Sequence, residues 1–180
     1  LAGDPDVVVH LGTRDGRRRP PAWIGSGKVT AMDLDSRLSL DDACRGMDAV
    51  VHLAAVNEVE SASDPGEALK VNGLGTLRLL DAAQTRGVTR FIYLSTIHVY
   101  GTPLAGVITE RTLPRPRHPY AITHRVAEDF VLAAHDTGRL TGVVLRLSNG
   151  FGAPVSPEAD RWTLVVNDLC RQAVTTGRLV

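Results

Sequence analysis

The sequence has few cysteines, no net charge and no long apolar run, and each absence excludes a class of protein. Cys44 and Cys170 are the only cysteines and lie in dissimilar contexts, so neither a disulfide framework nor a zinc site is expected. The 20 basic and 20 acidic side chains cancel, which gives no field that favours nucleic acid or an anionic membrane. No stretch is apolar enough to span a bilayer. We expect a cytoplasmic protein without a metal, a nucleic-acid partner or a membrane segment.

The 180 residues are 43% hydrophobic, which is sufficient for one substantial core. Short β-forming runs alternate with helical patterns, and the longer strands read as covered on both faces. We therefore expect an α/β protein. The predicted strands are residues 6–11, 28–32, 48–55, 89–94 and 141–147, and the predicted helices are residues 40–47, 66–86, 119–136 and 162–173.

One strand leads directly to polar residues. The apolar run 91–94 ends in Ser95 and Thr96, at the sheet edge where open α/β folds place their ligands. Tyr120 follows a proline at the start of a predicted helix, and His124 lies four residues later on the same helical face. A strand-end hydroxyl, a phenol and a basic nitrogen would suffice for proton transfer at a carbinol or ketone carbon.

Several motifs carry a family resemblance. Residues 95–101, S-T-I-H-V-Y-G, resemble the S-[ST]-x-x-V-Y-G segment of the extended short-chain dehydrogenase/reductase family, the NAD-dependent epimerase/dehydratase group. The Tyr120 helix resembles the family's Tyr-x-x-x-Lys helix, with His124 in place of the lysine. Residues 71–76 resemble its V-N-x-x-G-T, and residues 146–154 are similar to its R-x-x-N-x-[YF]-G-x-P.

The resemblance implies a Rossmann-type fold, a doubly wound parallel sheet. It makes the strand near residue 7 the family's second strand, so we expect the first strand, the glycine-rich loop and the first helix to be missing, and the C-terminal substrate domain to be truncated. Residues 1–147 would form a partial dinucleotide-binding domain, and residues 148–180 would begin the substrate-binding portion. We expect the chain to be a fragment of a longer protein.

The same resemblance implies the catalytic residues Thr96, Tyr120 and His124. An unperturbed phenol has a pKa near ~10, so Tyr120 needs its phenolate stabilised, a task that the family gives to the lysine ammonium and the oxidised nicotinamide. A histidine with a pKa near ~6.5 is mostly neutral at pH 7 and is shorter than lysine. Two outcomes stay open: His124 acts as a weaker surrogate, or the protein is catalytically impaired and only binds or senses a dinucleotide.

The cofactor implied by the resemblance is NAD or NADP. Its predicted contacts are Arg14, Asp33, Leu34, Leu53, Ala54, Ala55, Asn72, Ser95, Tyr120 and His124. Small residues after strand 48–55 would let a cofactor ring approach the backbone, and His52 is better explained as a core histidine. Asp33 would accept from the adenine amino group, or it would simply cap a turn. Arg14 and the basic loop after it favour NADP, although such a loop is equally explained as solvated surface.

The substrate implied is a nucleotide-activated sugar, contacted by Thr96, His98 and Asn149. The expected enzyme is an epimerase or dehydratase, or a reductase, that transfers hydride with help from a tyrosine proton. A short-chain reductase of a non-sugar ketone stays possible, since fold does not fix substrate. By the same resemblance, helices 66–86 and 120–136 would pair with their copies in a homodimer through a four-helix bundle.

Overall fold

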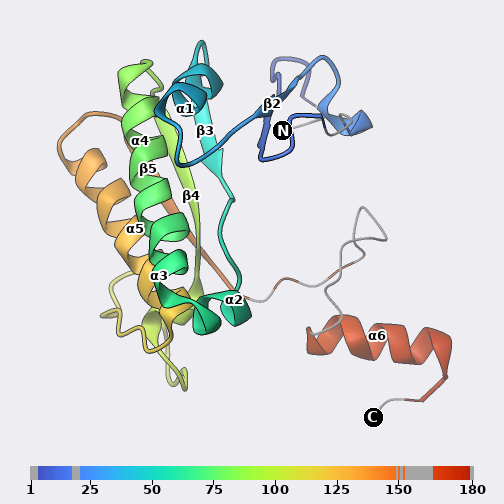
Figure 1. The fold of residues 1–180 in the computed structure, drawn as a ribbon. Coiled ribbons are helices and arrows are strands. Elements are labelled where there is room, and N and C mark those ends of the chain that lie inside the picture. The colour runs from blue at the N-terminus through green and yellow to red at the C-terminus, as the bar shows by residue number, and fades with distance from the viewer. Residues whose placement is uncertain (1–3, 18–20, 149, 151, 153–163, 179–180) are drawn as a thin grey trace. The chain divides into compact units, whose positions relative to one another are not determined.

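The computed structural model describes residues 4–17, 21–148, 150, 152 and 164–178 (Figure 1). The chain forms two compact units, Leu1–Arg146 and Leu147–Val180, and each is treated by itself. The first unit contains helices α1 to α5 and nearly all of the two sheets, and the second contains α6. The fold is of the expected Rossmann-like α/β class.

The smaller sheet is parallel and has two strands, joined through a short 3-10 helix: β1 (Leu11–Thr13), η1 (Ala22–Ile24) and β2 (Val29–Ala31). The second strand lies within the predicted range 28–32, but β1 begins where the predicted strand 6–11 ends. Val8 is 56% exposed and lies outside the ladder. A strand forms where a neighbour supplies hydrogen bonds, so β propensity alone placed this one too early.

Helix α1 (Arg37–Cys44) begins three residues before the predicted helix 40–47 and also ends three residues earlier. Its start is fixed by Ser36, whose hydroxyl accepts a hydrogen bond from the backbone N–H of Ser39 at 3.3 Å. N-terminal capping of this kind stabilises a helix by about 1 kcal/mol. The buried face of α1 carries Cys44, which is therefore a core residue as expected.

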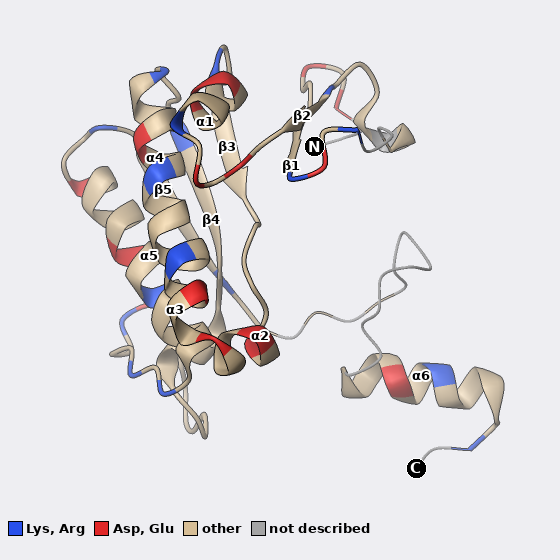
Figure 2. Ribbon diagram, viewed as in Figure 1, with Lys and Arg blue, Asp and Glu red and all other residues tan. Residues whose placement is uncertain are grey.

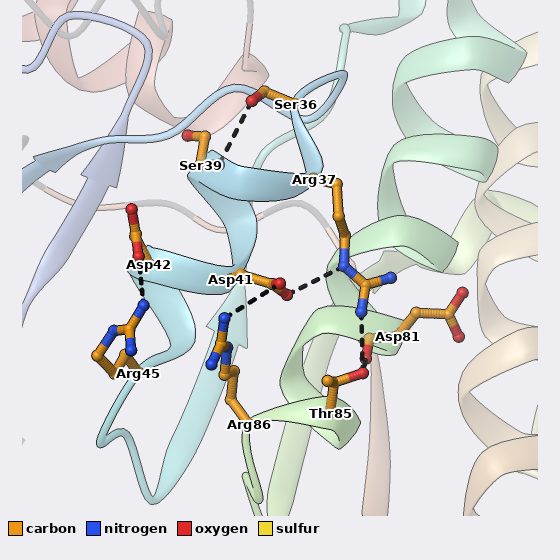
Figure 3. Close-up of polar contacts among 9 residues, drawn as sticks. All are labelled: Ser36, Arg37, Ser39, Asp41, Asp42, Arg45, Asp81, Thr85 and Arg86. Carbon is orange, nitrogen blue, oxygen red and sulfur yellow. Dashed lines mark hydrogen bonds and ion pairs between the residues drawn. The ribbon is translucent and has the colours of Figure 1, made fainter.

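Polar contacts join α1 to the C-terminal end of α4 (Figure 3). Asp41 accepts from Arg37 at 3.0 Å and from Arg86 at 3.2 Å, and Arg37 also donates to the hydroxyl of Thr85 at 2.9 Å. Exposed ion pairs contribute roughly 0–1 kcal/mol each. These contacts therefore orient α1 on the helical layer more than they stabilise the fold.

The larger sheet has three strands in the order β3 (Ala49–His52), β4 (Arg90–Thr96) and β5 (Thr141–Leu147), and β3 runs parallel to β4. Helices α4 and α5 lie side by side against this sheet (Figure 1). Phe91 and Tyr93 of β4 are almost completely buried between these layers. The bounds of β5 match the predicted strand 141–147.

The predicted helix 66–86 is present but not uniform. It is preceded by α2 (Glu58–Ser63) and runs through α3 (Pro65–Ala68), a π-helical segment (Leu69–Gly75) and α4 (Thr76–Thr85). Short π-helical insertions are rare and occur often at functional sites. The V-N-x-x-G-T resemblance falls on this irregular segment, so the motif marks a local change in helical geometry.

The two glycines of this motif are explained by close neighbours. A Cβ at Gly75 would lie 2.9 Å from the side chain of Leu34, and a Cβ at Gly73 would lie 3.1 Å from Leu69 and 3.4 Å from Val126 of α5. We expected glycine to permit close approach of helix and sheet. The structure instead shows a loop residue at one glycine and a neighbouring helix at the other.

Helix α5 (Pro119–Asp136) has the predicted bounds and begins with proline at its first turn, after His118 as N-cap. In the second unit, α6 (Val165–Thr175) covers most of the predicted helix 162–173, whose first residues lie outside the described part. Within the described ranges, no helix has the length and apolar character of a membrane span. Charged side chains of both signs lie mainly on helices and loops (Figure 2).

Candidate active site

The carboxyl end of β4 presents two adjacent hydroxyls with different partners. Ser95 donates to the Oε1 atom of Glu128 at 2.6 Å, so its hydrogen is used in the interior. Thr96 accepts from the backbone N–H of His98 at 3.2 Å and caps the 3-10 helix η3 (Ile97–Tyr100). Among the described residues, the hydroxyl hydrogen of Thr96 has no acceptor. Thr96 can therefore donate to a ligand oxygen, whereas Ser95 is structurally committed.

The glycine that ends this segment is sterically required. Gly101 has a φ of 98°, a conformation that other residues adopt with strain. A Cβ at this position would also lie 2.7 Å from the carbonyl oxygen of Arg115. The last residue of the S-T-I-H-V-Y-G segment therefore lets a distant loop pack against the end of η3.

Tyr120 and His124 lie one turn apart on α5, as their spacing predicts. Their rings meet edge to face, with centroids 4.4 Å apart and planes at 65°. Tyr120 is half-buried and His124 is 3% exposed. Helix α5 packs against both β4 and η3, the two elements that meet at Thr96. The structure thus joins the phenol and the imidazole directly and places the helix that carries them against the threonine's strand.

His124 also contacts Tyr93 of β4, a residue that the sequence analysis missed. The Tyr93 hydroxyl and the His124 Nδ1 atom are 2.7 Å apart, and the ring centroids are 5.7 Å apart. Burial lowers the pKa of His124 from 6.5 to about 4, while the charge of Glu128 acts in the opposite direction. His124 is therefore neutral at pH 7. It provides even less positive charge than an unperturbed histidine would.

One turn further along α5, Glu128 is fully buried and held by several donors. Arg146 of β5 binds it through two contacts, Nε to Oε1 at 2.9 Å and Nη2 to Oε2 at 2.7 Å. Arg125 donates to Oε2 at 3.1 Å, and Ser95 completes the set. Arg146 also donates to the hydroxyl of Tyr100 at 2.7 Å. The expectation that Arg146 must be paired is confirmed, and its partner is Glu128.

Glu128 was not selected from the sequence as a site residue, although a signal existed. It continues the i, i+4 row of Tyr120 and His124 on α5, and Arg146 is the charged residue within an apolar strand. Buried charges of opposite sign need each other, so these two positions were natural partners. The pair connects α5 to the ends of β4 and β5 below the site.

Asn72 of the π-helical segment is fully buried, as expected, but its partners differ from those expected. Its Oδ1 atom accepts from the backbone N–H of Val56 at 2.8 Å, and its Nδ2 atom donates to Thr123 at 3.0 Å. We expected it to brace the strand that ends in Thr96. It instead fixes the segment after β3 to helix α5, and so positions the chain around Ala54 and Ala55.

His52 is the core histidine that the sequence analysis predicted. It is 2% exposed, and its Nε2 atom lies 3.0 Å from the hydroxyl of Thr76. Burial, and then the nearby His124, lower the pKa of His52 to about 4. This imidazole is a neutral structural group.

The carboxyl end of β3 is open. Leu53 is 64% exposed, and Ala54 and Ala55 after it are also exposed. A cavity of about 190 Å³ lies beside this strand, between β3 and β1, and is lined in part by Gly12, Val51, Leu53 and Ala54. Among the described strands, β1 pairs only with β2, and β3 pairs only with β4. The cavity is therefore bordered by two unpaired strand edges.

The loop residues predicted to bind cofactor have mixed surroundings. Asp33 is exposed, and its Oδ1 atom accepts from the backbone N–H of Asp35 at 2.9 Å, so it shapes a turn as the alternative interpretation held. Leu34 packs against Gly75. Arg14 is exposed and directly follows the last residue of β1. The predicted cofactor contacts of these three residues stay predictions.

The predicted substrate contacts are described only in part. His98 lies half-buried in η3, and Asn149 lies outside the described residues. Among the described residues, no group of three or more histidine, cysteine, aspartate or glutamate side chains could hold a metal ion.

Comparison with known proteins identifies the family. The model of the NAD dependent epimerase/dehydratase family matches residues 2–177. The chain belongs to this family. It is 34% identical over 158 residues to a UDP-glucose 4-epimerase of Rhizobium leguminosarum bv. trifolii, which covers 86% of this chain and 47% of the relative. It is also 36% identical over 140 residues to a dTDP-glucose 4,6-dehydratase of Streptomyces niveus, covering 77% of this chain and 42% of the relative.

Solved structures agree with this family. The structure of RMD from Pseudomonas aeruginosa complexed with NADPH has a TM-score of 0.69 and 33% identity, and the match covers 82% of this chain and 51% of that one. The chain spans about half the length of the proteins it matches. The resemblance drawn from the four motifs is therefore confirmed at the level of family and fold, and the family's cofactors are NAD or NADP.

Residues of the described part fit a dinucleotide. The exposed Leu53 offers an apolar surface, and Ala54 and Ala55 leave the backbone accessible to a flat ring. On the α5 side, the Nε2 atom of His124 is buried without a hydrogen-bond partner among the described residues. A buried nitrogen of this kind indicates a site completed by a ligand.

Proposed function

We propose that this protein is an NAD(P)-dependent epimerase, dehydratase or reductase that acts on a nucleotide-activated sugar. Residues 1–147 would bind the dinucleotide, and residues 148–180 would begin the substrate-binding portion. Family membership and the names of the relatives support the reaction class. The observation that carries the proposal is the contact of Tyr120 with His124 on a helix packed against the strand that ends in Thr96.

The chemistry of the site would be shared between the cofactor and the chain. A bound nicotinamide would accept or supply the hydride. Tyr120 would move a proton to or from the substrate oxygen, and Thr96 would donate its unused hydroxyl hydrogen to that same oxygen. Leu53, Ala54 and Ala55 would hold the dinucleotide at the end of β3.

The neutral state of His124 limits this proton transfer. A lysine ammonium would stabilise a phenolate by charge, whereas a neutral imidazole can act only through a hydrogen bond. Tyr120 therefore keeps more of its ordinary phenol character, and we expect turnover to rise with pH above 7. General acid–base groups contribute about 10²–10⁴-fold to rate, so a poorly matched pKa reduces turnover without abolishing it.

The proposal is tested by incubating the protein with NAD or NADP and a panel of UDP- and dTDP-sugars. Nicotinamide absorbance reports net hydride transfer, and mass spectrometry with chromatography reports dehydrated or epimerised sugar. A product that requires both cofactor and protein is expected. Tight dinucleotide binding without any product from the panel would contradict the proposed enzyme.

That contrary result would favour a second candidate, a dinucleotide-binding or sensing protein of the same family. The observation in its favour is the uncharged His124 where the family has lysine. A sensor would bind the dinucleotide and change its conformation or assembly without consuming substrate. Calorimetry with NAD and NADP, run beside the turnover assay, separates these two candidates.

We also propose that the protein prefers NADP. Arg14 directly follows the end of β1, where arginine in dinucleotide-binding folds accommodates the ribose 2′-phosphate. Arg14→Ala should reduce the ratio of NADP to NAD affinity, while Arg17→Ala, three residues further along the loop, serves as the matched control. An unchanged ratio in Arg14→Ala would contradict this preference.

A homodimer through the α3–α4 and α5 helices is a further part of the proposal. Exposed apolar side chains occur on both elements: Leu69, Leu74, Ile122 and Phe130. Val131, which we expected to bear on this face, is instead buried in the monomer's core. Phe130→Glu should convert a dimer to a monomer in sedimentation analysis, and a monomeric wild-type protein would refute the dimer.

A further inference from the structure

The imidazole of His124 has one nitrogen that is bonded and one that is not. Its Nδ1 atom lies 2.7 Å from the Tyr93 hydroxyl. Its Nε2 atom is buried and has no partner among the described residues. A buried unpaired polar atom costs about 1–3 kcal/mol, so its presence calls for a physical reason.

The position of the imidazole hydrogen decides what the free nitrogen can do. A neutral imidazole has one N–H group and one lone pair. If Tyr93 donates to Nδ1, the hydrogen of His124 lies on Nε2, and the free nitrogen is a donor. If Nδ1 carries the hydrogen, Nε2 is an acceptor and the Tyr93 hydrogen must find another partner.

The surroundings of Tyr93 favour the first arrangement. Burial, and then the charge of Glu128, raise the pKa of Tyr93 above its ordinary value of 10.0, so this phenol keeps its hydrogen. The neighbouring Thr76 hydroxyl donates to the carbonyl oxygen of Asn72 at 2.5 Å, so His52 must be the donor to Thr76 at 3.0 Å. An imidazole lone pair is a stronger base than this already bonded hydroxyl. The Tyr93 hydrogen therefore goes to His124.

We propose that Tyr93 is a positioning residue that donates to His124 Nδ1 and thereby makes Nε2–H an uncharged hydrogen-bond donor in the active site. The inference rests on the proposed function for its role but not for its test. The Nε2–H group would donate to an oxygen that a bound ligand brings to the site, such as a hydroxyl. His124 would thus keep the donor capacity of an ammonium group while losing its charge.

The hydrogen position can be measured directly by NMR. The protein is labelled with ¹⁵N-histidine, and two-bond ¹H–¹⁵N correlations are recorded at pH 7, with His124→Gln used to identify the His124 signals. The proposal predicts a protonated Nε2 and an unprotonated, hydrogen-bonded Nδ1. A protonated Nδ1 in the wild-type protein would overturn it, whether or not any variant folds.

Two matched variants test the role of Tyr93. In Tyr93→Phe the Nδ1 signal should move to the position of a lone pair without a donor, and the two nitrogen signals should approach each other as both tautomers become populated. Tyr100→Phe removes a hydroxyl that binds Arg146 instead, and should leave the His124 signals in place. Identical His124 signals in Tyr93→Phe and wild type would also overturn the proposal.

These spectra need neither cofactor nor substrate. A protein with the predicted Nε2–H tautomer but no turnover would contradict the proposed function and support the inference about Tyr93. A protein that turns over substrate with hydrogen on Nδ1 would contradict the inference and support the proposed function. The two proposals can therefore fail separately.

Discussion

Two successive turns of α5 carry buried titratable side chains with contrasting environments. Glu128 is fully buried, and Arg146, Arg125 and Ser95 all donate to its carboxylate. His124, one turn earlier, is neutral and has one nitrogen without a partner. A fully bonded group is what a structural role requires, while the unpaired nitrogen indicates a place for a ligand. The comparison divides the site into a rigid base and a reactive upper part.

The largest expected effect concerns stability and the base. Glu128→Gln leaves the buried guanidinium of Arg146 without its opposite charge, and breaking a buried ion pair costs about 3–5 kcal/mol. Asp129→Asn is the matched control, because Asp129 is 57% exposed and its pair with Arg125 contributes less than about 1 kcal/mol. Urea unfolding gives both values. Equal losses in the two variants would contradict the structural role of Glu128.

The next prediction concerns pH. His52 and His124 both have pKa values of about 4 in the folded protein, lowered chiefly by burial. The unfolded chain takes up protons first, so stability is complete above about pH 6.5 and falls as the pH is lowered toward 4. Each imidazole accounts for roughly 3 kcal/mol of this loss at most.

Chemical denaturation at a series of pH values measures this loss, and His124→Gln should remove about half of the pH dependence. The charge of Glu128 opposes the shift at His124, which reduces that residue's share. A free energy of unfolding that does not change between pH 6.5 and 4.5 would show that neither imidazole is neutral and buried.

A neighbouring pair at the end of β4 sharpens the division between base and reactive part. Ser95→Ala removes a donor from a charged carboxylate and should cost about 1.5–3 kcal/mol of stability. Thr96→Val should chiefly reduce turnover, and Thr96→Ser, which keeps the hydroxyl, should retain it. Unfolding and turnover are measured for all three variants. Loss of turnover in Thr96→Ser equal to that in Thr96→Val would show that the hydroxyl is not what matters.

The smallest expected effect is that of His124→Lys. Lysine restores the ammonium that stabilises a phenolate, so turnover should stay the same or rise, and its pH profile should move to lower pH. His124→Gln keeps a neutral donor of similar size and is the matched control without charge. Turnover against pH measures the effect. A His124→Lys protein that folds but is much slower than wild type would indicate that the imidazole itself has been selected.

Much of the fold could be predicted because its signals are local. Helix α5 begins at Pro119 and β5 is an uninterrupted β-forming run, so their bounds were found. The start of β1 was missed because it depends on pairing with β2, and the start of α1 was missed because Ser36 caps it. The π-helical segment is a departure that hydrophobic periodicity does not report.

The site was predictable where its residues share one helix and not where they come from different elements. Tyr120 and His124 follow from a four-residue spacing. Tyr93 lies 31 positions before His124, so its contact depends on how α5 packs on β4. The pairing of Ser95 with Glu128 has the same origin. Family motifs pointed to the loop residues, yet Asp33 and Asn72 have structural partners that the motifs did not specify.

The central claim is that the Tyr120 phenol transfers the proton during turnover. The most direct test is the rate of product formation by Tyr120→Phe, beside Tyr100→Phe, which removes a phenol hydroxyl from the rigid base. Loss of about 10²–10⁴-fold is predicted for Tyr120→Phe, with wild-type folding confirmed by circular dichroism. Turnover by Tyr120→Phe at the wild-type rate would contradict the account.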